Sequence, residues 1–248
     1  RINSASDDAA GLAISENLKS QIRSSRQSKR NANDAISLIQ TAEGGLSEIS
    51  NIIIRLRELA VQAASDTIGD TERGFSDIEF QQLKEEIDRI SRSSEFNSIK
   101  LLDGTGGQLE FQIGVHNDPI LDRIRYDGTS ADATLAALGL TAETVSSKQG
   151  SQVSLKKLDN SLVQVNGVRA NLGALQNRLT SIINNLGVSD ENLSAANSRI
   201  RDVDIAEENE DQPLLNRLSG ALSLLEQTIA NQEEKLYSDL PEALENNY

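Results

Sequence analysis

The feature that most constrains this chain is a pair of long, proline-free stretches in which aliphatic residues recur every three or four positions. The first stretch covers residues 4 to about 66 and the second about 151–205. This spacing places the aliphatic side chains in one stripe along one face of a helix, as in coiled coils. The first stripe consists of Ala32, Ile36, Ile39, Ala42, Leu46, Ile49, Ile53, Leu56 and Leu59. The second consists of Leu158, Leu162, Val165, Leu172, Leu175, Leu179, Ile182, Leu186, Leu193, Ala196, Ile200 and Val203.

The length of these stretches decides how they can pack. At 1.5 Å per residue, a helix of about 55 residues is roughly 80 Å long, which is too long to be buried inside a globular domain of this size. We therefore predict that the two helices lie against each other and that the fold is mainly α, an elongated antiparallel bundle. The pair Gly44-Gly45 interrupts the first stripe, and it predicts a kink, a short connector or a close approach of another element.

Shorter elements are predicted between the two long helices. A turn covers residues 65–71, and a helix from about 76 to 93 carries Ile78, Leu83, Ile87 and Ile90 on one side. Alternating residues in 108–113 and 120–126 predict a small β-hairpin near the tip of the bundle, joined through a turn at His116–Pro119. A further amphipathic helix is expected between Pro213 and Pro241, in an acidic tail.

Composition narrows the class of protein. The aromatic share is 3%, which is low for a compact enzyme but sufficient for helices that meet along an aliphatic seam. The formal net charge of −14 argues against nucleic acid as a partner, because phosphate binding depends on Lys and Arg. No apolar run reaches the ~20 residues of a membrane span.

The residues that catalysis needs are scarce. His116 is the only histidine and there is no cysteine, so neither a two-histidine zinc motif nor a thiolate site can form. The glycines at 104, 106 and 107 are not followed by the lysine of a phosphate-binding loop. We therefore predict no catalytic residues, no metal and no cofactor, and we interpret the chain as a protein that is not an enzyme.

Several motifs in one order resemble bacterial flagellins. They are residues 1–14 (RINSASDDAAGLAI), 56–64 (LRELAVQAA), 86–90 (EIDRI) with 95–97 (EFN), 169–179 (RANLGALQNRL) and 192–204 (NLSAANSRIRDVD). The resemblance covers about residues 1–206. It implies a structural subunit of the extracellular flagellar filament, which is secreted, serves motility and contacts other flagellin subunits.

The resemblance also implies a domain organisation. Residues 1–103 and 150–206 would form a discontinuous helical rod domain, residues 104–149 a small hairpin and loop region in place of the variable domains, and residues 207–248 a tail unlike the family. Family members begin some tens of residues before the signature with an apolar arm, so the chain as given is expected not to assemble alone. The alternatives are a rod-like binding or junction module, or a flagellin fused to a partner or chaperone helix.

Finally, the resemblance implies a receptor-binding face. Flagellins are ligands of a vertebrate toll-like receptor, and the matching positions are Arg55, Leu59, Gln62 and Glu79. An arginine beside an apolar side chain is a frequent anchor of protein interfaces. From the residues alone, Leu59 could instead be part of the core and Arg55 a solvated charge. An export chaperone is a further expected partner.

Overall fold

The computed structural model of the chain describes residue 6, residues 8–202 and residues 217–232. Residues 17–195 form one unit, and the segments before and after them belong to a second unit, which is treated separately. The helices and strands in chain order are α1 (Ala9–Ala63), α2 (Asp70–Ser93), β1 (Glu95–Phe96), β2 (Ile99–Lys100), β3 (Gln108–Gln112), β4 (Arg123–Asp127) and α3 (Lys148–Arg201). The predicted mainly α fold, with long helices and a small β-hairpin, is confirmed.

α1 is one uninterrupted helix. It begins after Asp8, whose Oδ1 accepts hydrogen bonds from the backbone N–H groups of Ala10 and Gly11, as an N-cap does. The helix runs straight through the two predicted interrupting glycines at 44 and 45. The predicted stripe from Ala32 to Leu59 is buried, except for the partly buried Ile36.

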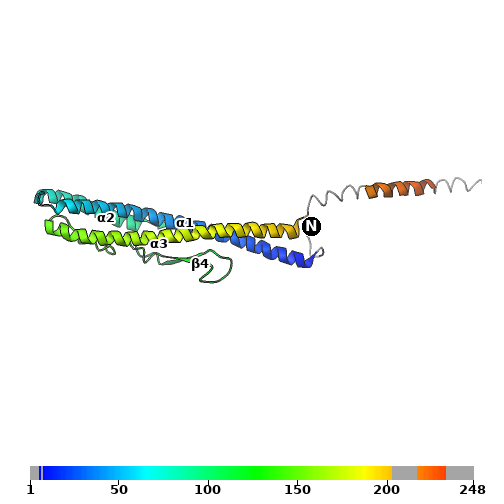
Figure 1. Ribbon diagram of the computed structural model, residues 1–248, viewed down its shortest axis with the longest axis horizontal. Helices are drawn as coiled ribbons and strands as arrows, with labels where there is room; N and C mark the ends of the chain where they lie inside the picture. Colours follow the sequence, from blue (N-terminus) through cyan, green and yellow to red (C-terminus); the bar gives the residue numbers. More distant parts are fainter. Residues whose placement is uncertain (1–5, 7, 203–216, 233–248) are drawn as a thin grey trace, which may run out of the picture. The chain divides into compact units, whose positions relative to one another are not determined.

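Within residues 17–195, α1 and α3 lie side by side in opposite directions (Figure 1). Ion pairs between the two helices define this register, because the residue number on α3 falls as that on α1 rises. The pairs are Arg26–Asp190 at 3.0 Å, Glu43–Arg169 at 2.8 Å and Arg57–Asp159 at 2.7 Å. Beneath them, the aliphatic stripes of both helices meet in one core. The predicted antiparallel pairing is therefore confirmed.

Serines of α3 are also buried, although the sequence pattern does not mark them as core. Ser151, Ser154 and Ser161 on α3 are fully buried. Their hydroxyls hydrogen-bond within the fold; Ser161 Oγ, for example, donates to the Leu158 carbonyl at 2.9 Å. A small hydroxyl that bonds locally can be buried at low cost and lets neighbouring elements come close.

The turn between α1 and α2 is as predicted, but α2 begins at Asp70 and not near residue 76. After α2, β1 and β2 pair as a short antiparallel hairpin of two residues in each strand, which the sequence pattern does not predict. Its turn residues Asn97 and Ser98 have φ of 50° and 64°, a left-handed conformation that suits a tight hairpin.

The longer hairpin pairs β3 with β4 in antiparallel register, with Gln108 opposite Asp127 and Gln112 opposite Arg123. It packs against α1 at residues 28–31. Ser28 Oγ on α1 donates to the Gly114 carbonyl, and Asn31 Nδ2 donates to the Gln112 carbonyl. The strands are also shorter than predicted, because Ile120 and Leu121 belong to the connecting loop.

In the second unit, Arg201 near the end of α3 pairs with Glu16 on α1 at 3.3 Å. Residues 217–232 are helical, in agreement with the amphipathic helix expected between Pro213 and Pro241, although the rest of that segment lies outside the described residues. Across the ranges 8–202 and 217–232, no helix combines the length and the apolarity of a membrane span.

Candidate functional site

The predicted receptor-binding face centres on an ion pair between α1 and α2. Arg55 Nε and Nη2 both donate to Glu79 Oε1, at 3.0 and 2.8 Å, and Arg55 Nη1 donates to Glu58 Oε2 at 2.9 Å. These hydrogen bonds, first the one to Glu79, raise the pKa of the guanidinium above its usual value. The Arg55 and Glu79 side chains are 50% and 46% exposed. The face therefore presents a charged pair that a partner can reach.

The other two predicted receptor-binding residues, Gln62 and Leu59, differ in their exposure to solvent. Gln62 is exposed about two turns beyond Arg55 on α1. Leu59 is only 3% exposed and packs in the α1–α2–α3 core. The expectation that Leu59 presents its side chain to a partner needs correction, because its position in the aliphatic stripe turns it inward. Leu59 packs in the core beneath the exposed residues of this face.

Exposed apolar side chains on α2 were missed by the sequence analysis. Phe75 is 68% exposed and Ile78 is 64% exposed. Ile78 was expected on the apolar side of α2 with Ile87, but the buried side follows Phe80 and Ile87, which are seven positions apart. The signal was available, since Phe75 and Ile78 are out of phase with that seven-residue spacing.

A buried arginine fixes the turn that joins α1 to α2. Arg73 Nε donates to the Ala63 carbonyl and Nη2 to the Ser65 carbonyl, both at 2.8 Å, while Nη1 contacts Asp70 at 2.7 Å. Carbonyls at the end of a helix lack partners within the helix, and a cation there also complements the helix dipole. Arg73 thereby ties the start of α2 to the end of α1, and so holds Glu79 opposite Arg55.

A second buried cation attaches the segment before α3. Lys84 Nζ donates to the carbonyls of Thr141 and Glu143, at 3.0 and 2.8 Å, and lies 5.9 Å from the centre of the Phe80 ring. Burial lowers the pKa of this ammonium, while the nearby carboxylates of Asp77 and Glu143 act in the opposite direction. The Glu143 carboxylate in turn accepts from α3. This network connects α2 to α3.

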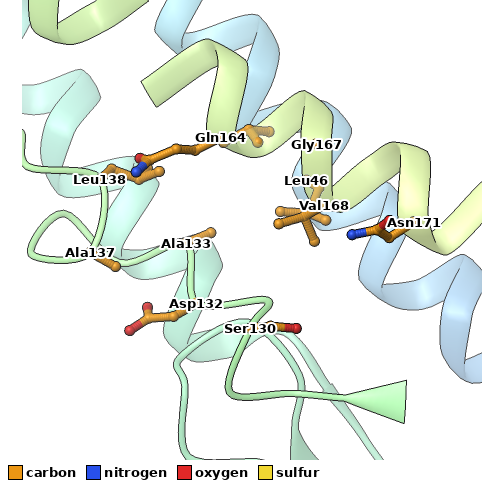
Figure 2. Close-up of a pocket in the computed structure, with 11 residues that line it drawn as sticks. Leu46, Ser130, Asp132, Ala133, Ala137, Leu138, Gln164, Gly167, Val168 and Asn171 are labelled. Atoms are coloured by element: carbon orange, nitrogen blue, oxygen red, sulfur yellow. The ribbon is translucent and has the colours of Figure 1, made fainter. Parts of the chain in front are cut away.

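A cavity of about 300 Å³ lies between α3, Leu46 of α1 and the segment 130–138. Figure 2 shows Gln164, Val168 and Asn171 of α3 facing this segment. Asp132 is the one titratable residue that lines it, and its Oδ1 accepts from the Thr134 backbone N–H. The Asp132 carboxylate therefore stabilises a local turn. The residues that line the cavity include no second titratable side chain, so they offer no pair that could act as general acid and general base.

His116, the one histidine, lies exposed in the loop between β3 and β4. Within the part of the chain that the structure describes, three or more His, Asp or Glu side chains nowhere gather as a metal site would require. Two long antiparallel helices with charged and apolar side chains on their outer face place the chain in the class of elongated helical bundles.

Comparison with known proteins identifies the class more closely. Residues 1–106 match the N-terminal helical region of bacterial flagellin, and residues 155–234 match its C-terminal helical region. A flagellin of Halalkalibacterium halodurans is 46% identical over 84% of this chain and 75% of its own length. A flagellin of Bacillus subtilis is 43% identical over 89% of this chain and 82% of its own.

A solved structure agrees with the sequence comparison. The crystal structure of Bacillus cereus flagellin is 34% identical and superposes with a TM-score of 0.57, over 63% of this chain and 88% of that chain. The chain belongs to the bacterial flagellin family. The C-terminal match continues to residue 234, past residue 206, where the sequence analysis placed the end of the family-like region. The division into three segments stays a prediction.

Proposed function

We propose that the chain is a structural subunit of the bacterial flagellar filament, which assembles with other flagellin subunits outside the cell and serves motility. The observation that supports this most is the antiparallel contact of α1 with α3, which joins the two regions that match the family's helical regions. The matched relatives are flagellins, and we infer that this chain, like them, has a structural role and is not an enzyme. Deleting the gene should abolish or shorten the filaments, and restoring it should return motility. Unchanged filaments after deletion would remove this function.

We also propose that the α1–α2 face is recognised by the vertebrate flagellin-sensing toll-like receptor. Support comes from the exposed pair of Arg55 with Glu79, beside exposed Gln62 and above buried Leu59. The sharpest test is the double variant Arg55→Ala, Glu79→Ala. We expect its potency in cells that carry the receptor to fall at least about tenfold, as when an interface anchor is truncated.

A matched control distinguishes recognition from a general loss of charge. Arg57 and Asp159 form another exposed ion pair of α1, with α3 in place of α2. Arg57→Ala, Asp159→Ala removes the same groups from outside the proposed face and is expected to leave potency unchanged. Equal potency of both double variants would remove the receptor proposal and leave the filament proposal standing.

We propose, in addition, that an export chaperone binds the helix at residues 217–232. Leu218, Leu222, Leu225 and Ile229 recur at steps of three or four positions and are each more than half exposed. An amphipathic helix of this kind fits a hydrophobic groove. Leu222→Asp, Leu225→Asp is expected to lower the amount of secreted protein without lowering its synthesis. Normal secretion of this variant would exclude the helix as a chaperone site.

A further inference from the structure

The first half of α1 carries a line of basic side chains. Residues 17–33 contain five Lys or Arg residues and no Asp or Glu, in a chain whose net charge is −14. Four of the five recur at steps of four, three and four positions, so they lie in one line along the helix, roughly 17 Å long. We name them the basic row: Lys19, Arg23, Arg26 and Arg30.

The basic row lies on the solvent side of α1 and has definite ends. Its three arginines are exposed and Lys19 is half-buried. The opposite side of the helix is buried at Ile22, Ser25, Ser28 and Ala32. Along α1, the nearest acidic residues before and after the segment 17–33 are Glu16 and Asp34. The row is therefore a short positive surface that an anionic molecule can reach.

Beside the row, α3 offers uncharged polar groups. Arg26 Nε donates to both carboxylate oxygens of Asp190 at 3.0 Å, and Lys29 Nζ lies 3.8 Å from the position of a Cβ at Gly187. Residues 179–189 include no acidic or basic side chain. An open hollow of about 590 Å³ lies along this part of α3, and its lining is Asn184, Asn185, Val188, Ser189, Asn192 and Leu193.

The row and the hollow suit different parts of one ligand. A guanidinium group binds sulfate, phosphate or carboxylate through paired N–H donors. An asparagine amide both donates and accepts hydrogen bonds, so it can pair with a hydroxyl group. A ligand that uses both surfaces therefore carries anionic groups at intervals along a chain that is rich in hydroxyls. A linear anionic polysaccharide has this composition.

Other polyanions fit these surfaces less well. Of the 24 basic residues of the chain only 19 lie outside the segment 17–33, against all 38 acidic residues. A DNA duplex or a flat anionic membrane would also cover this acidic surface, which would repel it. Single-stranded nucleic acid binds by stacking its bases on aromatic side chains, and residues 17–33 and 179–193 contain none. A thin sugar chain meets neither obstacle.

We propose that the basic row of α1 and the adjoining hollow of α3 bind a linear anionic polysaccharide. The row pairs with the charged groups of the ligand, while Asn184 and Asn192 hydrogen-bond to its hydroxyls and Val188 contacts the apolar face of a sugar ring. Asp190 competes with the ligand for Arg26. This binding is additional to the proposed filament function and does not depend on it.

Isothermal titration calorimetry of the purified full chain tests the row, with a heparin octasaccharide as the sulfated probe. Arg23→Gln, Arg30→Gln removes two charges of the row and should weaken binding at least about tenfold. The slope of log K against log salt concentration should fall by roughly one to two. The control Arg89→Gln, Arg92→Gln removes two charges from α2, where these side chains are 63% and 67% exposed. An equal loss in the control would overturn the proposal.

Two uncharged changes distinguish a built site from a charged patch. Asn184→Ala, Asn192→Ala removes two amides from the hollow and no charge. We expect the affinity to fall at least about threefold while the salt dependence stays the same. Asp190→Asn releases Arg26 and should strengthen binding of the octasaccharide. Unchanged affinity of the asparagine variant would show that charge alone attracts the probe, and would overturn the proposal.

Further probes identify the anionic group and test the class of ligand. An alginate oligosaccharide of the same length carries carboxylates in place of sulfates, so the tighter of the two probes names the group that the row prefers. A single-stranded oligonucleotide, a DNA duplex or phosphatidylglycerol vesicles that displace heparin at equal charge concentration would overturn the proposal. So would the absence of binding by both oligosaccharides at about 0.15 M salt. None of these results alters the filament function.

Discussion

Gly44 and Gly45 are neighbours in α1, yet alanine at these two positions is expected to change stability in opposite directions. Gly44 is exposed, and apart from its chain neighbours and the backbone of its own helix no atom lies within 4 Å of an ideal Cβ there. Gly44→Ala should stabilise the fold by about 1 kcal/mol, since glycine costs that much relative to alanine inside a helix. A Cβ at Gly45 would lie 2.7 Å from Ser94 Oγ and 2.8 Å from Leu102 Cδ1.

Neither neighbour of Gly45 can easily move aside. Ser94 Oγ donates to the Ile90 carbonyl at 2.7 Å, and Leu102 is fully buried. Overpacking of this kind costs about 2 kcal/mol, of which about 1 kcal/mol is offset by the better helix propensity of alanine. We expect Gly45→Ala to destabilise the fold by about 1 kcal/mol. The two variants should therefore differ by about 2 kcal/mol.

Urea unfolding followed by circular dichroism at 222 nm measures this difference. With equal slopes, the two midpoints should lie on opposite sides of the wild-type midpoint and be separated by roughly 1 M. Adding Ser94→Ala to Gly45→Ala removes the 2.7 Å contact and should recover part of the loss. Equal stabilisation by alanine at both positions would refute the close approach at Gly45.

Three further predictions concern buried polar groups. Arg73→Met leaves the carbonyls at the end of α1 without their donor, and we expect a loss of about 2–3 kcal/mol in urea unfolding, with faster amide exchange in the turn after α1. Lys84→Met should cost about 1–3 kcal/mol, because two loop carbonyls lose their partner; unchanged stability would show that water replaces the ammonium. Burial raises the pKa of Tyr126 to about 12. The protonated phenol therefore contributes to the free energy of unfolding in full below the ordinary pKa near 10, and this contribution is lost as the pH rises towards 12. Alkaline unfolding curves of wild type and Tyr126→Phe should therefore converge over this range, by roughly 2–3 kcal/mol, and parallel curves would contradict the shift.

The long helices were predictable because their stabilising contacts repeat along the sequence. Each turn of α1 adds another aliphatic residue to the same stripe, so the pattern from Ala32 to Leu59 determines both the helix and its buried face. The second stripe implies the antiparallel partner in the same way. The ion pair of Arg57 with Asp159, by contrast, depends on a register that no local pattern carries.

The features that could not be predicted from the sequence depend on single contacts between residues that are distant in the chain. Arg73 looks like an ordinary surface charge until the end of α1 is placed beside it. The position of the hairpin follows from Ser28 and Asn31, two polar residues within a helix, and not from the strands themselves. For the same reason, the candidate site could be predicted only in part from the sequence. Resemblance indicates Arg55 and Glu79, but the inward position of Leu59 and the exposure of Phe75 become clear only when α1 and α2 are packed.

The most direct test of the filament function is electron microscopy of cells labelled with a gold-conjugated antibody raised against this chain. A filament subunit predicts label along the whole length of the filaments, and no label after deletion of the gene. Label confined to the base or the junction of the filament would indicate a junction module instead. Filaments that carry no label anywhere would contradict the account.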